Sequence, residues 1–461
     1  MRVLLVVYDN ESYISWFPQG LAYVATALRK HGHEVTIYNQ DVYHWPESHL
    51  KKLLDKEKFD AIGVSVIAGY FQYRKLLKIS EAINESINRP FYILGGHGPA
   101  PEPEYFLNKT GADVIVIGEG EITAIELMEV LEKKRKLSIV QGIAYIENKK
   151  ININPRRPLI QNIDEIDLPA WDLFPMDHYT LLRSFPHINN NERCLPVLSG
   201  RGCIFQCNFC FRLDKGFRPR SIENILEEIK ILNETYHVTA IEFSDELLMS
   251  SEDRTIEICE GILKSNISIK WGCNGRLNFS KPRVLKLMKK AGCVFINYGI
   301  ESLDQDALNI MKKGLTIEMI YSGVQNTIDI GITPGLNIIF GNIGENRESL
   351  KKDVEFLLKY SDASQMRTIR PVTPYPGCDL YKYAIKKGLL KNVEDFYENK
   401  HVNSDLLSVN FTDLTDDEFH KELFEANKIL INNYYEIARN QTIDRARNLY
   451  YKRDTKFRGF R

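Results

Sequence analysis

The chain has 461 residues, of which 44% are hydrophobic and 26% are charged, and its formal net charge is −1. This length allows about three domains, and the composition is that of an ordinary globular protein. The near-neutral charge argues against a nucleic-acid ligand, which usually demands a basic protein surface. No run of uncharged apolar residues is long enough to predict a transmembrane helix.

All eight cysteines lie at or after Cys194. Eight cysteines in a chain of this length do not make a disulfide scaffold. Their distribution predicts a thiol-free N-terminal domain followed by a domain that uses thiols, and it fits the reducing cytoplasm. The opening run Arg2–Tyr8 is too short for the apolar core of a signal peptide and is expected to be a strand.

Residues 1–150 alternate short apolar runs with segments whose apolar spacing is near that of a helix. This alternation is typical of a doubly wound, Rossmann-like parallel α/β sheet, whose ligands bind on the loops beyond the strands. The expected strands are Val3–Tyr8, Glu34–Tyr38, Ala61–Ile67, Phe91–Leu94 and Val114–Ile117, with helices at Gly20–Lys30, Phe71–Asn88 and Glu121–Lys134. The loops that follow these strands are Asp9–Pro18, Ile67–Gln72, Gly95–Pro99 and Gly118–Glu121.

Two of these loops, Gly95–Pro99 and Gly118–Glu121, are rich in glycine. Either they let the backbone approach a bulky partner closely or they are simply tight turns. A hairpin is expected next, with strands at Gly142–Ile146 and Ile151–Asn154.

Residues 151–194 are expected to be a stiff, mostly extended connector. Six of the 18 prolines fall between Pro155 and Pro196, and proline restricts the backbone. Trp171 and Phe174 within this connector are expected either to plug an interface between domains or to anchor the linker.

Residues 195–390 again alternate strands and helices, in longer units. The pattern predicts a partial (β/α)6 barrel of the TIM type, with its chemistry at the carboxyl ends of the strands. The expected strands are Leu195–Ser199, Ala240–Phe243, Ile267–Gly272, Val294–Tyr298, Thr333–Phe340 and Gln365–Ile369, with helices at Ile222–Tyr236, Thr255–Lys264, Pro282–Ala291, Ile317–Ile330 and Glu348–Tyr360.

Cys203, Cys207 and Cys210 form a C-x3-C-x2-C run on the loop after the first of these strands. Three thiolates on one loop can hold three corners of a [4Fe–4S] cluster and leave the fourth iron open to a small molecule. A structural zinc site usually takes four protein ligands. The alternatives are three reduced structural thiols or a partial zinc site.

This cysteine spacing, with Phe209 just before the last thiol, resembles the signature of radical S-adenosylmethionine (SAM) enzymes. The order Pro18-x-Gly-Leu-Ala-Tyr23, Gly32-His-Glu-Val35, Gly95-Gly-His97 and Gly118-Glu-Gly-Glu121 resembles the cobalamin-binding domain that precedes many radical SAM domains. The resemblance, to the class B methyltransferase-like members, covers nearly the whole chain.

The resemblance implies three cofactors, which are a [4Fe–4S] cluster, SAM and cobalamin. It gives the cluster to Cys203, Cys207 and Cys210. It gives SAM to Phe209, Ser244, Asp245, Glu246, Arg276, Glu301 and Gly341. It gives cobalamin to Tyr13, Gly20, Ala68, Gly69, Gly95, Gly96, His97, Gly118, Glu119 and Gly120.

The chain departs from relatives in two loops. Asp9-Asn-Glu-Ser-Tyr13 has no histidine where cobalamin mutases supply one to cobalt, so cobalt is expected without a histidine lower ligand. His97 could bind cobalt instead, but it is expected to line the pocket. Gly341-Asn-Ile-Gly-Glu345 replaces the usual Gly-Leu-Pro-Gly-Glu, and the loss of proline is expected to loosen this turn.

By the resemblance, the enzyme cleaves SAM to a 5′-deoxyadenosyl radical and, with cobalamin as methyl carrier, methylates an unactivated carbon of a small molecule. The electron comes from a reductant such as flavodoxin or ferredoxin. The alternatives are a radical rearrangement, cyclisation or ring contraction with the same cofactors, a tRNA methylthiotransferase, and a cobalamin-binding sensor. The absence of cysteine before Cys194 argues against a methylthiotransferase.

Residues 391–461 are expected to be a helical C-terminal extension. Thr415–Glu418 begins a helix that runs towards Arg439, with a capping box at its start. Arg445–Arg461 is basic and aromatic, so it is either a solvated terminus or a contact for a membrane surface or an anionic carrier.

Overall fold

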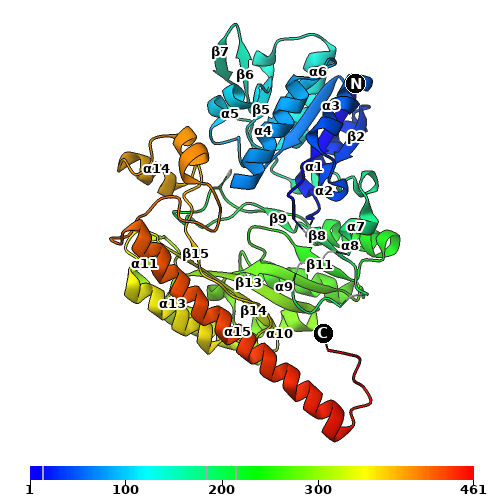
Figure 1. Cartoon of the computed structure of the whole chain (residues 1–461). Coiled ribbons are helices and arrows are strands. Elements are labelled where there is room, and N and C mark those ends of the chain that lie inside the picture. The colour runs from blue at the N-terminus through cyan, green and yellow to red at the C-terminus, as the bar shows by residue number, and fades with distance from the viewer. Residues whose placement is uncertain (13–14, 182–184, 190, 213–214, 461) are drawn as a thin grey trace.

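Two sheets, one in each half of the chain, organise the computed structural model, which describes residues 1–12, 15–181, 185–189, 191–212 and 215–460. Figure 1 shows the first sheet at the top, the second below it, and a long helix crossing the second. The α/β fold predicted from the sequence is confirmed.

The first sheet has the strand order β2-β1-β3-β4-β5-β6-β7. Its first five strands in the chain run parallel, and the hairpin β6–β7 adds an antiparallel edge. Buried apolar side chains on these short strands form the core between two helical layers. The strands are β1 (Arg2–Val7), β2 (Glu34–Asn39), β3 (Ala61–Ser65), β4 (Phe91–Gly95), β5 (Val114–Val116), β6 (Ile143–Glu147) and β7 (Lys150–Ile153).

The helices around this sheet include three that the sequence pattern predicts and three that it does not. α1 (Gln19–Lys30), α4 (Tyr70–Asn84) and α6 (Gly120–Glu132) lie where apolar spacing places them. The additional helices are α2 (Gln40–Tyr43), α3 (Glu47–Lys56) and α5 (Pro103–Thr110). α3 buries only Leu50 and Leu54, which is too short an apolar stripe to detect by periodicity.

The second sheet is parallel, with the order β15-β14-β13-β12-β11-β8, and forms the predicted partial barrel. Its strands are β8 (Cys194–Val197), β11 (Ala240–Phe243), β12 (Lys270–Gly275), β13 (Cys293–Glu301), β14 (Thr333–Phe340) and β15 (Arg370–Pro371). Its helices are α8 (Ile222–Tyr236), α9 (Glu252–Lys264), α10 (Pro282–Lys290), α11 (Gln305–Ile310), α12 (Ile317–Asp329) and α13 (Arg347–Lys359).

The sixth strand is not where the sequence pattern predicts it. The expected strand Gln365–Ile369 is wrong, because the backbone N–H and C=O of Ile369 bond to the side chain of Asn427 instead of to a neighbouring strand. Pairing with β14 begins only at β15 and covers two residues, as suits an edge strand that contains proline.

The connector joins the two sheets through aromatic packing. Trp171, in the 3-10 turn η3 (Trp171–Leu173), stacks on Phe17 with the ring centroids 4.3 Å apart, and Phe174 meets Phe17 edge-on at 5.0 Å. All three side chains are buried in a core that continues from the first sheet into the barrel. Trp171 and Phe174 therefore fill the joint between the two halves.

Residues 372–411 return from the barrel to the helices of the first sheet. This segment contains α14 (Asp379–Lys386) and a π-helical turn, η5 (Asp395–Lys400). Tyr397 stacks on Tyr73 of α4 at 4.6 Å, and Glu398 forms ion pairs with Arg74 and Lys109. We call residues 372–411 the return segment. The domain limits at residues 150, 194 and 390 stay predictions.

The last helix, α15 (Asp416–Lys452), begins with the predicted capping box between Thr415 and Glu418 and continues past Arg439. Its first half buries Phe419, Leu423, Ala426 and Leu430, whereas its second half extends beyond the barrel (Figure 1). Among the described residues, no helix has the length and apolar character that a membrane span needs.

Candidate functional site

A cavity of about 410 Å³ lies between the carboxyl edge of the first sheet and the loops of the barrel. Most residues expected at the cobalamin site line it, which are Gly20, Gly95, Gly96, His97, Gly118, Glu119 and Gly120. Ala68 and Gly69 are not among its lining residues. Gly69 instead precedes α4, where an added Cβ would meet the side chain of Gln72. Tyr13 lies outside the described residues.

Small and apolar residues line the part of the cavity beside the first sheet, among them Leu5, Gly63 and Ala124. A Cβ added at Gly20 or Gly118 would have no atom within 4 Å and would occupy open space. The positive φ of Gly118, +112°, also favours glycine there. The loops thus form a cradle that fits a bulky group with an apolar body, as cobalamin requires.

An ion-pair network connects this cradle to the barrel. Arg201 in the short strand β9 (Gly200–Arg201) donates to Glu119 at 2.9 Å and to Glu121 at 2.6 Å. Arg218 in β10 (Arg218–Pro219) reaches Glu119 at 3.0 Å. The two arginines also line the cavity. The sequence analysis predicted neither arginine as a site residue. The only sign of them in the sequence is the acidic loop Gly118–Glu121, which does not indicate which distant cations it binds.

The three cysteines of the C-x3-C-x2-C run lie on the loop that follows β9. Cys203 and Cys207 are half-buried, and Cys210 is exposed. Burial raises the pKa of the Cys203 thiol. Within the described part of the chain, no three His, Cys, Asp or Glu side chains gather around one metal position. In a [4Fe–4S] cluster each thiolate binds a different iron, so its ligands do not share such a position.

Arg276 supplies a second observation that fits a cluster at this loop. Its guanidinium lies over the ring of Phe205, 3.4 Å from the centroid, and next to Cys207. The side chain is buried, and burial lowers its pKa. Within the part of the chain that the structure describes, its Nε and Nη2 have no hydrogen-bond partner. A buried cation with free donors requires an anionic partner. A thiolate-bound cluster, or the carboxylate of SAM, is such a partner.

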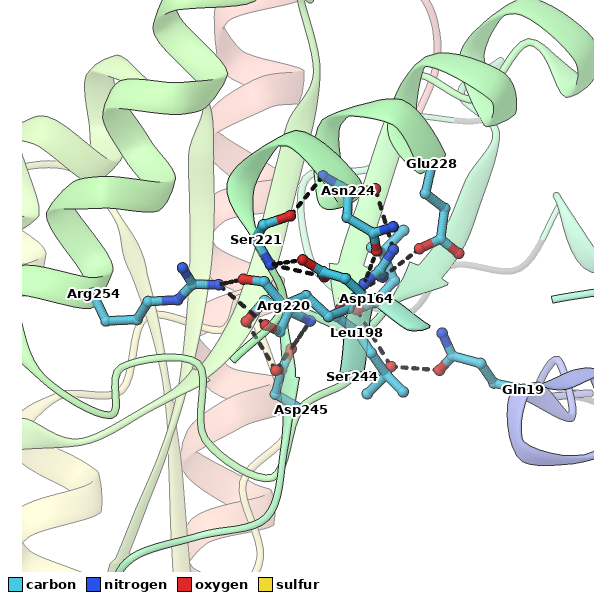
Figure 2. Close-up of polar contacts among 12 residues, drawn as sticks. Gln19, Asp164, Leu198, Arg220, Ser221, Asn224, Glu228, Ser244, Asp245 and Arg254 are labelled. Atoms are coloured by element: carbon cyan, nitrogen blue, oxygen red, sulfur yellow. Dashed lines mark hydrogen bonds and ion pairs between the residues drawn. The ribbon is translucent and has the colours of Figure 1, made fainter. Parts of the chain in front are cut away.

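The three side chains of the segment Ser244-Asp-Glu246, which follows β11, have two different roles, and Figure 2 shows the contacts of Ser244 and Asp245. The hydroxyl of Ser244 donates to Oε1 of Gln19 at 2.7 Å, across to the first sheet, and both Ser244 and Glu246 line the cavity. Asp245 is buried and accepts from the backbone N–H and the hydroxyl of Ser199. Burial raises the pKa of Asp245 to about 6. Asp245 therefore positions the strand that leads to the cysteines.

Figure 2 also shows the buried contacts beneath this strand. Arg220 forms an ion pair with Glu228 of α8 and donates to the carbonyl of Leu198 at 2.6 Å. Arg254 of α9 donates to the carbonyls of Arg220 and Ser199. These bonds satisfy backbone groups near the cysteine loop and connect it to α8 and α9.

Glu301 and Gly341, the other residues expected near SAM, lie at the ends of β13 and β14. Glu301 accepts from Nζ of Lys313 at 2.8 Å, and both side chains are buried. Its backbone has φ +74° at a bulge, a strained conformation for a residue with a side chain. Gly341 lies against α15, because an added Cβ would meet the ring of Phe419 at 2.6 Å. The Lys313 ammonium lies 6.0 Å from the Phe209 ring.

Cys378 caps a helix, and His97 lines the cavity. Cys378 is buried and caps α14 by accepting the backbone N–H of Tyr381 at 3.3 Å, and burial raises its pKa to about 11. The ring of His97 lines the cavity and meets Phe211 edge-on at 6.3 Å.

Comparison with known proteins adds two family matches. Residues 6–128 match the B12 binding domain, and residues 197–357 match the Radical SAM superfamily. An uncharacterized methyltransferase of Pyrococcus horikoshii is 32% identical over 427 residues, covering 88% of this chain and 90% of that protein. An anaerobic magnesium-protoporphyrin IX monomethyl ester cyclase of Rubrivivax gelatinosus is 27% identical over 80% of this chain and 66% of the cyclase.

A solved structure shares the arrangement of both halves. The radical SAM methyltransferase TsrM from Kitasatospora setae, determined with cobalamin and a [4Fe–4S] cluster, matches with a TM-score of 0.73. The match covers 93% of this chain and 88% of that chain at 16% identity, so it concerns the fold.

Proposed function

Because this chain belongs to the radical SAM enzymes that carry a B12-binding domain, we propose that it is a cobalamin-dependent methyltransferase that methylates an unactivated carbon of a small molecule. When bound, the [4Fe–4S] cluster with SAM supplies a 5′-deoxyadenosyl radical and cobalamin supplies the methyl group. The observation that carries the proposal is the single cavity shared by the glycine loops of the first sheet and the loops of the barrel.

We assign the cluster to Cys203, Cys207 and Cys210. Arg276 lies beside this loop, and its Nε and Nη2 have no partner among the described residues, so it would neutralise the negative charge of the thiolates or bind the carboxylate of SAM. Ser244 and Glu246 face the cavity and are placed to hold polar groups of SAM. Glu301 would do the same from β13, in the orientation that Lys313 gives it.

We assign cobalamin to the cradle of Gly20, Gly95, Gly96, Gly118 and Gly120, with His97 as a lining residue. The apolar part of the cradle excludes water, and the ion pairs of Arg201 hold the cradle against the barrel. Exclusion of water and oxygen protects a radical from side reactions. The sequence places no histidine in the loop Asp9–Tyr13, so we propose that cobalt takes no histidine from it.

The electron is proposed to come from a flavodoxin or ferredoxin, in a reducing compartment such as the cytoplasm. Arg445–Arg461 remains a candidate contact for an anionic surface or carrier, because the basic side chains that the structure describes in this segment, up to Arg458, are exposed.

The test uses anaerobic protein reconstituted with iron and sulfide and loaded with cobalamin. We expect about four irons per chain, and formation of S-adenosylhomocysteine and 5′-deoxyadenosine after reduction with SAM present. Cys210→Ala should abolish SAM cleavage. Cys378→Ser, which keeps the cap of α14, should not. A gain of one methylene in the product distinguishes methyl transfer from rearrangement, cyclisation or ring contraction. Protein with about one zinc, or with neither cluster nor corrinoid, would contradict the proposal.

A further inference from the structure

A reciprocal pair of side-chain amides joins the cysteine loop to the turn after β14. Asn208 lies between Cys207 and Cys210, and Asn342 follows Gly341. Nδ2 of Asn208 donates to Oδ1 of Asn342 at 3.1 Å, and Nδ2 of Asn342 donates back to Oδ1 of Asn208 at 3.0 Å. Both residues are buried, so water does not compete for these hydrogen bonds.

The backbone of Asn208 is held as firmly as its side chain. Its N–H donates to the carbonyl of Met311 at 3.0 Å, and its carbonyl accepts the N–H of Leu380 at 2.8 Å. Asn208 thereby connects the cysteine loop to three separate parts of the chain, which are the end of α11, the start of α14 and the turn after β14. A residue with this many partners fixes the position of the cysteines on either side of it.

Asn342 lies in the turn Gly341–Glu345, which lacks the proline expected from the family resemblance. The loosening expected from this loss stays a prediction, and the turn has three hydrogen bonds of its own. Oε2 of Glu345 accepts the N–H groups of Gly341 and Asn342 at 2.9 and 2.8 Å, and Oδ1 of Asn342 accepts the N–H of Ile343 at 2.8 Å. The last of these bonds needs a residue with an N–H at position 343, which proline lacks, and it fixes the side chain of Asn342 within the turn.

We infer that the Asn208–Asn342 pair is a positioning device that sets Cys207 and Cys210 for the cluster. The inference rests on the proposed function, because it concerns the ligand loop of that cluster. By the family resemblance, Asn342 stands in place of a leucine, whose side chain can form no such bond. In this inference the two asparagines act through the position of the cysteines and not by contact with the reacting atoms.

The first test needs no cofactor. Hydrogen exchange in the iron-free protein should be faster in the peptide that contains residues 203–212 when Asn342 is replaced by Leu, because Asn208 then loses its buried partner. Asn342→Ser is the second variant, since serine fits the turn and can still accept the N–H of Ile343. Asn427→Leu is the matched control, because it loses two hydrogen bonds to Ile369 that lie away from the cysteine loop.

The second test follows the reconstituted protein. We expect Asn342→Leu and Asn208→Leu each to speed the loss of iron to a chelator by about tenfold and to change the EPR signal of the reduced cluster. The double variant should lose iron about tenfold faster, not a hundredfold, because the two residues act as one pair. Asn427→Leu should lower the unfolding temperature without altering iron loss or the EPR signal.

The outcomes separate the inference from the proposed function. Wild-type protein that holds a cluster, together with Asn342→Leu protein of unchanged hydrogen exchange and iron loss, overturns the inference alone. Independent, multiplicative effects of the two substitutions also overturn it. Wild-type protein that takes up no four-iron cluster overturns both.

Discussion

The guanidinium of Arg201 donates to the carboxylate of Glu119 at 2.9 Å, and this bond joins the cysteine loop to the glycine cradle. Arg201 is the second residue before Cys203, and Glu119 lies between two glycines that line the cavity. The side chains are 17% and 9% exposed, so the pair is largely shielded from solvent. A direct contact therefore holds the cysteine loop in a fixed position relative to the glycine cradle, the two places that we propose for the cluster and for cobalamin.

Arg201→Met should destabilise the protein and weaken cobalamin binding together. The substitution removes the cation paired with Glu121 and one of the two cations paired with Glu119, which keeps Arg218. A buried carboxylate that loses its cation costs about 3 kcal/mol. Urea unfolding and cobalamin titration measure the two effects. Arg29→Met is the control, because its ion pair with Asp172 is exposed and worth less than about 1 kcal/mol. Equal losses in the two variants would argue against a special role for Arg201.

Gly20→Leu should reduce cobalamin affinity without harm to the fold. Gly20 lies in the first turn of α1, where leucine is a better helix former by about 0.8 kcal/mol, and its side chain would project into the cradle. We expect at least about tenfold weaker binding by equilibrium dialysis and an unchanged or higher unfolding temperature. Gly20→Ala should have a smaller effect. Unchanged affinity in Gly20→Leu would place cobalamin elsewhere.

The buried carboxyl group of Glu345 should cause the free energy of unfolding to fall as pH rises. Burial raises its pKa to about 8, and burial with the nearby Glu345 charge raises that of Asp353. Because the pKa of Glu345 is higher in the folded than in the unfolded state, its proton stabilises the fold fully below about pH 4.5, and this contribution is lost as pH rises through about 8.

Glu345→Gln should flatten that dependence. Glutamine keeps an oxygen for the N–H groups of Gly341 and Asn342, whereas it cannot ionise. The free energy of unfolding of the iron-free protein, measured between pH 5 and 8.5, tests this prediction. Its slope against pH should differ between the two proteins by up to about 1.4 kcal/mol per pH unit. Glu348→Gln, a change at an exposed residue nearby, should keep the wild-type slope. A Glu345→Gln slope equal to wild type would refute the assignment.

His97→Phe should leave the bound cobalamin spectroscopically unchanged. Phenylalanine preserves the edge-on contact with Phe211 and cannot bind cobalt. The EPR spectrum of the cobalt(II) form, recorded before and after the substitution, is the measurement. Loss of a nitrogen splitting in the variant would show that His97 is a ligand.

Local patterns predicted much of the fold because strands and long helices bury a regular apolar face. β11, β14 and α8 begin and end at the predicted residues. The pattern failed where a tertiary contact decided the structure. Gln365–Ile369 has strand-like residues, yet Asn427 of α15 takes the hydrogen-bonding groups of Ile369.

In the candidate site, too, features that depend on local sequence were predicted and contacts between distant residues were not. Glycines and cysteines in short motifs predicted the cavity and the cysteine loop, because their roles depend on local backbone shape. The contacts of Arg201 with Glu119 and of Asn208 with Asn342 span 82 and 134 residues. Neither partner indicates the other in the sequence, since only the folded chain brings them together.

The return segment has a consequence for how the protein is made. The Tyr73 hydroxyl meets Glu398, 325 residues later in the chain, and the buried core around α4 and α5 includes residues up to Val409. During translation the N-terminal sheet leaves the ribosome long before that covering exists, and contacts of such long range form slowly. We therefore expect the nascent first half to expose apolar side chains near α4 and α5 until residues 372–411 have been synthesised, and to bind chaperones during that time.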